Sequence, residues 1–243
     1  MLNRFLVRSG RSSSPVLREG EVHVWLVQAN GERTSPEDLE ALLSSVEQTR
    51  ASRFKFETDR RRYVTVHFAL RSILSTYLNS PAQELQFELG PYGKPKLASI
   101  HAGKKFEFNL SHSHEVALIA VTQAGEIGVD IEYVKKDFPI HEVAGNFFTP
   151  KETAALTTLP EYLQPQAFFK CWTSKEALLK AKGTGLSGEL DEVEITLVGG
   201  QHVRITANVP GWSLVELIAC DGYEAALVSE GEPAQVHLYR WEP

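Results

Sequence analysis

Hydrophobic and polar positions along the chain change their period several times, and each change predicts a change of secondary structure. Apolar and aromatic residues recur at helical spacing over 59–78, and a second long helix is expected at 161–181. The segments 116–121 and 127–133 instead have the residue content and turn punctuation of strands. Strands are also expected after the second long helix, so helix followed by sheet occurs twice.

Shorter segments complete this order. The other expected helices are 36–43, 50–56 and 150–157, and the other expected strands are 22–27, 85–89, 105–110, 193–197, 202–207, 213–219, 224–229 and 235–241. The turn Gln123-Ala124-Gly125 predicts a hairpin of 116–121 with 127–133, for which 223–229 with 236–241 is the expected counterpart. Because short turns rather than crossover helices join neighbouring strands, we expect an α+β fold of two halves with antiparallel sheets.

Length and charge narrow the class of protein. The chain has 243 residues, enough for one large domain or for two packed halves with a core each. Its formal net charge of −6 argues against a general nucleic-acid binder, which is usually basic over at least one domain. Any anion-binding site is therefore expected to be formed by a small cluster of basic residues rather than by a generally basic surface.

The sequence predicts a soluble, cytoplasmic protein. The leader 1–15 lacks the apolar core of a secretory signal and is interpreted as a mobile tail. The longest apolar run, 116–121, is only as long as a strand, so no membrane span is expected. Cys171 and Cys220 have apolar surroundings and no metal-ligand spacing, which favours reduced thiols, with a structural disulfide as the alternative.

Two carboxylates share one face of an expected strand. In Gly128-Val129-Asp130-Ile131-Glu132, apolar and acidic residues alternate, so both carboxylates are expected on the face opposite Val129 and Ile131. For an isolated strand the simpler interpretation is a solvent-exposed edge. The alternative is a pair of oxygen ligands for magnesium or manganese.

A third carboxylate lies on the second long helix. Within 172–180, helical spacing places Trp172, Glu176 and Lys180 on one face. The simpler interpretation is an exposed ion pair between Glu176 and Lys180, which stabilises a helix by only a few tenths of a kcal/mol. Gly183-Thr184-Gly185 follows, a turn at which the backbone can approach a ligand closely.

These segments belong to an ordered set of motifs that resembles the Sfp-type 4′-phosphopantetheinyl transferases. The motifs are Gly93-Lys94-Pro95, Phe108-Asn109-Leu110-Ser111-His112-Ser113, Gly128 to Glu132, Phe147-Phe148-Thr149-Pro150-Lys151-Glu152, and Trp172 to Lys180 followed by Gly183-Thr184-Gly185-Leu186-Ser187. Each is short, but together and in this order they span roughly residues 45 to 190 and are specific to the family.

The resemblance implies an architecture and a reaction. Two similar halves, 16–134 and 135–243, would be related by a pseudo-twofold axis, with the active site in the cleft between them and the chain active as a monomer. The enzyme would transfer the 4′-phosphopantetheine arm of coenzyme A to a serine of an apo acyl or peptidyl carrier protein. Adenosine 3′,5′-bisphosphate would be released. Such proteins serve fatty acid, polyketide or nonribosomal peptide biosynthesis.

The resemblance also implies roles for the acidic residues and two lysines. Asp130, Glu132 and Glu176 would bind Mg2+, which neutralises the pyrophosphate and orients it for in-line attack. Glu176 is also the candidate general base for the serine. Lys175 and Lys180 would lie near the phosphates or the reacting serine, a task that suits lysine as a point charge.

Coenzyme A would be held by residues from the first half. Ser111 and His112 match positions that contact it in the family, and a charged imidazole would make binding weaken as pH rises. Arg50, Arg62 and Lys94 are the expected partners of its other phosphate groups. The simpler interpretation is that most of these cations belong to a solvated face, formed by Arg50, Arg53, Lys55, Arg60, Arg61 and Arg62. Arg53, Arg60 and Arg61 stay unassigned.

The family seats its carrier protein near Phe147-Phe148. Neighbouring aromatic residues diverge, so at least one is expected in the core while the other can contact a partner. Asn146 stands where many relatives carry a basic residue, which leaves a salt bridge to an acidic carrier helix in question. Two other functions stay open at this stage: a binding module without activity, and a magnesium-dependent phosphohydrolase. The sequence does not reveal which carrier is modified, whether acylated coenzyme A is accepted, or whether Mn2+ replaces Mg2+.

Overall fold

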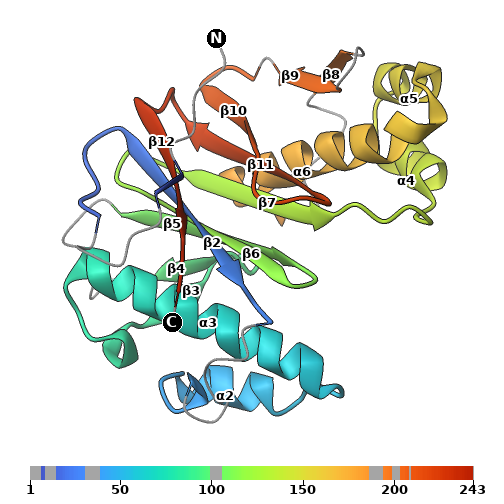
Figure 1. Ribbon diagram of the computed structural model, residues 1–243. Coiled ribbons are helices and arrows are strands. Elements are labelled where there is room, and N and C mark those ends of the chain that lie inside the picture. The colour runs from blue at the N-terminus through green and yellow to red at the C-terminus, as the bar shows by residue number, and fades with distance from the viewer. Residues whose placement is uncertain are drawn as a thin grey trace.

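The protein is built in four layers, with two packed sheets between two groups of helices (Figure 1). The computed structural model describes residues 7–8, 15–30, 39–98, 106–185, 194–198, 203–207 and 209–242. Most of the expected tail and the start of the helix expected at 36–43 lie outside these residues. Within the described part of the chain, no helix combines the length and apolar content needed to cross a membrane.

The first sheet takes strands from both ends of the chain. Its order is β1 (Val7–Arg8), β12 (Gln235–Arg240), β2 (Glu21–Gln28), β6 (Val116–Thr122) and β5 (Glu107–Ser113). The pairs β2–β6 and β5–β6 are antiparallel, but β12 runs parallel to both β1 and β2. The expectation of purely antiparallel sheets is therefore wrong for this strand, because the chain returns to the first sheet only after completing the second.

The second sheet is antiparallel, in the order β10 (Trp212–Leu217), β11 (Tyr223–Glu230) and β7 (Ile127–Tyr133). Two small antiparallel ladders join β3 (Phe87–Leu89) to β4 (Pro95–Leu97) and β8 (Ile195–Val198) to β9 (Arg204–Ala207). The two larger sheets pack face to face through a buried apolar cluster that includes Val24, Leu118, Val129, Ile131 and Leu227.

Both expected hairpins are wrong. β6 pairs with β2 and β5, whereas β7 pairs with β11, so the turn after β6 carries the chain from one sheet to the other. The physical reason is burial: all residues of β6 are buried, because its two faces pack against different layers. β11 and β12 are separated in the same way. The sheets therefore do not follow the expected boundary at 134/135: β7 precedes it but belongs to the second sheet, and β12 follows it but belongs to the first.

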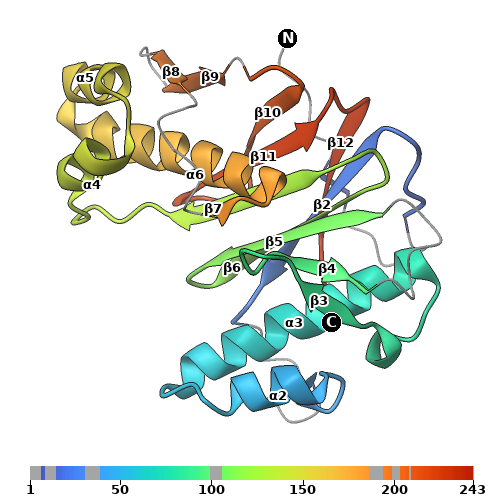
Figure 2. The same ribbon diagram turned by 180° about the vertical axis from the view of Figure 1, so that it is seen from behind.

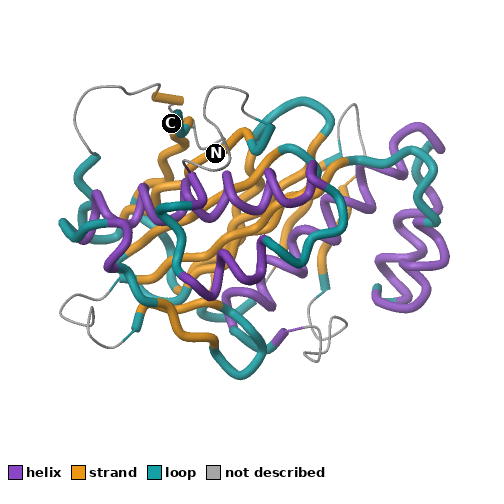
Figure 3. Tube along the Cα trace, turned by 90° about the horizontal axis from the view of Figure 1, so that it is seen from below, coloured by secondary structure: helices purple, strands orange, loops and turns teal. Residues whose placement is uncertain are grey.

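Helices cover the outer faces of the two sheets. They are α2 (Ser45–Ala51), α3 (Glu57–Leu78), α4 (Ile140–Phe147), α5 (Pro150–Thr158) and α6 (Gln164–Lys182). α4 was not expected, and α2 ends near the start of the helix expected at 50–56. α4 and α5 stand at one end of the sheets (Figure 3).

The long helix α3 packs on the first sheet as its periodicity predicts. Val66, Leu70, Ile73 and Leu74 are buried against apolar residues of the sheet. Fully burying one such side chain contributes about 1.5–3 kcal/mol, so this face alone fixes the helix on the sheet.

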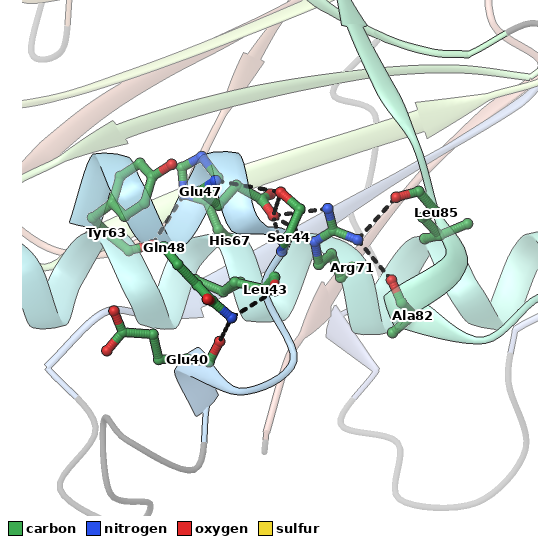
Figure 4. Close-up of polar contacts among 10 residues, drawn as sticks. All are labelled: Glu40, Leu43, Ser44, Glu47, Gln48, Tyr63, His67, Arg71, Ala82 and Leu85. Carbon is green, nitrogen blue, oxygen red and sulfur yellow. Dashed lines mark hydrogen bonds and ion pairs between the residues drawn. The ribbon is translucent and has the colours of Figure 1, made fainter. Parts of the chain in front are cut away.

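A buried ion pair attaches α2 to α3 (Figure 4). Glu47 closes a capping box with Ser44 and accepts hydrogen bonds from Arg71, whose Nη1 also donates to the carbonyl oxygens of Ala82 and Leu85. Burial would raise the pKa of Glu47, but the hydrogen bonds from Ser44 and Arg71 outweigh it and lower that pKa. The network holds the N-terminal turn of α2 in place over α3.

Candidate active site

Three carboxylates from two elements converge on one cavity of about 340 Å³. β7 contributes Asp130 and Glu132, and α6 contributes Glu176, as their periodicities predict. In Figure 2, β5, β7 and α6 lie next to one another on the same side of the molecule. The lining residues are Leu110, Ser111, His112, Asp130, Glu132, Trp172, Glu176 and Lys180.

A glycine lets the two elements come this close. Gly128 stands two residues before Asp130, where α6 crosses β7. A Cβ atom at this position would overlap the carbonyl oxygen of Ala177 and the backbone nitrogen of Ala181. The helix backbone therefore lies directly on the strand, which brings Glu176 and Lys180 within reach of the strand carboxylates.

Serines on β5 orient the strand carboxylates. Ser111 Oγ donates to Asp130 Oδ1 at 2.7 Å, and Ser113 Oγ donates to Glu132 Oε2 at 2.7 Å. Asn109, the next alternate residue on β5, accepts from the backbone N–H of Val129. Ser113 was not anticipated from the sequence, although polar residues at every second position of 109–113 are a signal that could have revealed it.

Lys180 completes the contacts of one oxygen of Asp130. Its Nζ lies 2.6 Å from Asp130 Oδ1 and donates to Ser111 Oγ at 2.9 Å. Its side chain is still partly exposed, so the ammonium group stands at the border between the buried carboxylate and the cavity.

Two buried oxygens in the site have no hydrogen-bond partner among the described residues. They are Asp130 Oδ2 and Glu176 Oε1. Burial, and next the charge of Asp130, raise the pKa of Glu176 to about 7. Burial likewise raises the pKa of Glu132. Hard divalent cations prefer oxygen ligands, and a cation would also offset the repulsion among these carboxylates. The residues therefore fit Mg2+.

A second cavity of about 210 Å³ meets the first at His112, which lines both. Arg62, Tyr63, His67 and His114 are among its other lining residues. The Arg50 guanidinium carbon lies 5.6 Å from the centroid of the Tyr63 ring. The structure thus brings the expected coenzyme A residues Arg50, Arg62 and His112 together. Tyr63 and His67 were not foreseen as lining residues, because helical periodicity alone marks Tyr63 as core.

The protonation of His112 depends on these neighbours. Partial removal from water, followed by the charges of Lys180 and Arg50, lowers its pKa in the ligand-free protein. The charged imidazole expected from the sequence would thus require the bound phosphate to offset these effects.

Lys94 lies away from both cavities. Its Nζ donates to Glu126 Oε2 at 2.8 Å and to the carbonyl oxygens of Ile127 and Ala181. It therefore ties the start of β7 to the last turn of α6 instead of pointing at the expected nucleotide site.

Lys175 also lies outside the cavity, although it directly precedes Glu176. It is only 1% exposed, and its Nζ lies 3.0 Å from Glu152 Oε1 and 5.8 Å from the Phe148 ring centroid. Glu152 also closes the capping box at Thr149 and accepts from the backbone N–H of Ile195. In this position Lys175 holds α5 and α6 together; the expected role near phosphate is not supported by its contacts.

The adjacent aromatics diverge as expected. Phe148 is buried in the cluster around α6, whereas Phe147 is 40% exposed and packs edge-on against Trp172, which lines the cavity. Asn146 Nδ2 donates a hydrogen bond to the carbonyl oxygen of Glu142 within α4. An exposed aromatic thus stands next to a residue of the site.

Comparison with known proteins identifies the family. Residues 126–228 match the 4′-phosphopantetheinyl transferase superfamily, and residues 33–124 match the 4′-phosphopantetheinyl transferase N-terminal family. The chain is 37% identical over 227 residues to 4′-phosphopantetheinyl transferase HetI of Nostoc sp., which covers 93% of this chain and 92% of that protein. It is 35% identical over 211 residues to 4′-phosphopantetheinyl transferase psf-1 of Bacillus pumilus, covering 85% and 87% of the two chains.

A more distant relative gives the same result. 4′-Phosphopantetheinyl transferase Sfp of Bacillus subtilis is 29% identical over 166 residues, which cover 68% of this chain and 71% of that protein. The chain belongs to the 4′-phosphopantetheinyl transferase superfamily. Its reaction is transfer of phosphopantetheine from coenzyme A to a carrier protein, which confirms the family predicted from the sequence motifs.

Proposed function

We propose that this transferase works with Mg2+ held by Asp130, Glu132 and Glu176. The observation that carries the proposal is a pair of buried oxygens on the wall of one cavity, Asp130 Oδ2 and Glu176 Oε1, which no described residue hydrogen-bonds. When bound there, the metal would supply positive charge against the pyrophosphate of coenzyme A.

The protein's own groups would prepare this site. Ser111 and Ser113 hold the two strand carboxylates in fixed orientations. Lys180 occupies Asp130 Oδ1 and leaves Oδ2 for the cation. Its ammonium group would also stabilise negative charge that develops on the leaving phosphate.

Glu176 is the proposed general base. Its carboxylate lies on the cavity wall, where it would take a proton, directly or through water, from the serine hydroxyl of the carrier. The attacking oxygen would then form its bond to phosphorus as the bond to adenosine 3′,5′-bisphosphate breaks. The phosphopantetheine arm would leave on the serine.

The second cavity is the proposed seat of the nucleotide part of coenzyme A. Arg62 and His112 line this cavity, and Arg50 stacks on its Tyr63 wall. Guanidinium and imidazole donors suit phosphate oxygens. Because His112 lines both cavities, it would contact coenzyme A near the point where the nucleotide meets the reacting pyrophosphate.

The site would lie between two similar halves related by a pseudo-twofold axis. β5 and β7 belong to the first half and α6 to the second, so the cavity lies where residues of the two halves meet. Since one chain carries the carboxylates from both halves, Asp130 and Glu132 on β7 and Glu176 on α6, we propose an active monomer. An acyl or peptidyl carrier protein would dock near the exposed Phe147.

The free cysteines Cys171 and Cys220 are compatible with a cytoplasmic enzyme.

Metal binding tests this proposal directly. Isothermal titration of the protein with Mg2+, and with Mn2+ as a second probe, should give one site that Asp130→Asn weakens at least about tenfold, an effect typical of disturbed metal sites. Asp137→Asn, on an exposed residue outside the cavity, is the matched control. Equal affinity in wild type and Asp130→Asn would overturn the metal assignment.

A further inference from the structure

A second cluster of ligand-type side chains lies in the first sheet, outside both cavities. Glu21 and His23 are two residues apart on β2, so their side chains share one face of the sheet. His237 on the parallel strand β12 is the direct partner of His23 in the pairing register. Register and pleat therefore place one carboxylate and two imidazoles together on the two strands, which run side by side in Figure 1.

The three side chains are close enough to share one ion. One ligand atom from each can be chosen so that all three lie within 4.8 Å of one another. His23 Nε2 lies 3.5 Å from Glu21 Oε2, and His237 Nε2 lies 3.8 Å from Glu21 Oε1. Two ligands of a tetrahedral zinc ion, each about 2.0–2.1 Å from the metal, are about 3.3 Å apart. Small side-chain rotations would thus close the site.

The same distances are those of long ion pairs and exceed the usual length of a hydrogen bond. Hydrogen bonds between nitrogen and oxygen are typically about 2.7–3.2 Å long. In addition, His237 Nδ1 is buried and has no hydrogen-bond partner among the described residues. Among the described residues, the polar contact of the His237 ring is therefore the long approach of its Nε2 to Glu21.

His23 is held as metal-ligating histidines usually are. Its Nδ1 lies 2.8 Å from the hydroxyl of Tyr77, which also accepts from Trp25 Nε1. A hydrogen bond at one ring nitrogen fixes the ring and presents the other nitrogen to a metal. The His23 ring also packs 5.3 Å, centroid to centroid and edge-on, from the His237 ring.

We propose that Glu21, His23 and His237 form a binding site for a transition metal of the zinc type. Two imidazoles and one carboxylate favour zinc over magnesium or calcium, which prefer oxygen ligands alone. Glu21 and His237 keep a small exposed fraction whereas His23 is buried, so an ion would enter past those two side chains. Bound zinc would join β2 to the last strand of the chain, so its role would be to hold β12 in the first sheet.

Zinc titration of the full chain tests the site separately from transferase activity. Isothermal titration with Zn2+ is run in excess Mg2+, so that the carboxylates at Asp130 are already occupied. We expect one Zn2+ per chain, at least about tenfold weaker binding in His237→Gln and in Glu21→Gln, and no change in Asp130→Asn. Two variants are used because one could fold poorly; circular dichroism checks each.

His141→Gln is the matched control, since His141 is exposed on α4 and distant in sequence from the cluster. Co2+ provides a spectroscopic probe, because tetrahedral coordination gives a visible absorption band that both cluster variants should lose. Zinc should also raise the melting temperature of the wild type more than that of His237→Gln. Equal zinc affinity in wild type and both folded variants, or zinc binding lost only in Asp130→Asn, would overturn the proposal.

Discussion

Ser111 donates a hydrogen bond to Oδ1 of Asp130 across two sheets, and it thereby fixes which carboxylate oxygen faces the cavity. With Lys180 on the same oxygen, Oδ2 is the atom left for a cation. The relationship explains how a strand carboxylate, which could have been a solvated edge residue, becomes part of a site.

Removing the charge of Glu176 should change how stability depends on pH. The pKa of Glu176 rises from an ordinary value of 4.5 to about 7 on folding, so the folded state binds more protons between these values. Its contribution is therefore present below about pH 4.5 and is lost as pH rises through about 7. The raised pKa of Glu132 acts in the same direction.

Urea unfolding of the metal-free protein at about pH 5 and about pH 8 measures this effect. Wild type should lose more stability between the two conditions than Glu176→Gln does. An identical change in both proteins would contradict the raised pKa.

Coenzyme A should bind more weakly as pH rises, through His112. The free protein lowers the pKa of this histidine, and a bound phosphate would raise it again, so binding takes up a proton. The favourable contribution is complete below the pKa of the free protein and is lost as pH rises through the higher pKa of the complex. Titrations across this range should show a steeper pH dependence for wild type than for His112→Gln; parallel curves would exclude the role.

Lys175→Met should damage the fold more than the chemistry. It leaves the fully buried Glu152 carboxylate without its ion-pair partner, which typically costs about 3–5 kcal/mol. Chemical denaturation should show this loss, and the second substitution Glu152→Gln should recover part of it. Lys136→Met, at an exposed position, is the control. A stable Lys175→Met protein without activity would instead restore the catalytic role expected from the sequence.

Gly128→Ala should prevent α6 from lying on β7. The added Cβ would overlap backbone atoms of Ala177 and Ala181, which cannot move aside as a flexible side chain would. We expect a loss of at least about 3 kcal/mol, at the upper end of overpacking effects. Gly145→Ala is a matched control because its Cβ would meet nothing within 4 Å in α4. A melting temperature equal to that of wild type would contradict the close packing.

Local periodicity predicted the faces of the site but not all its neighbours. Asp130 and Glu132 share a strand face, and Glu176 and Lys180 share a helix face, because periods of 2 and 3.6 determine both. The same helical period turns Lys175 about 100° away from Glu176. Its neighbour Glu152 comes from another helix, so only the packing of α5 on α6 decides where the lysine points.

Long-range pairing was beyond the sequence pattern. The turn at Gln123-Ala124-Gly125 is compatible with a hairpin and with a passage between sheets, and burial on both faces of β6 selects the second. Lys94 likewise depends on the end of α6, which lies far along the chain. Motifs therefore identified the family, while tertiary packing decided which motif residues reach the cavity.

The central claim is that the cluster around Asp130 transfers phosphopantetheine with a metal. Intact-mass spectrometry of an apo acyl carrier protein and, in parallel, an apo peptidyl carrier protein, each incubated with coenzyme A and the enzyme, measures it most directly. We predict a gain of one phosphopantetheine arm on at least one carrier, which requires Mg2+ and is nearly abolished in folded Asp130→Asn. Unmodified carriers, with coenzyme A either intact or hydrolysed, or full transfer by Asp130→Asn, would contradict the account.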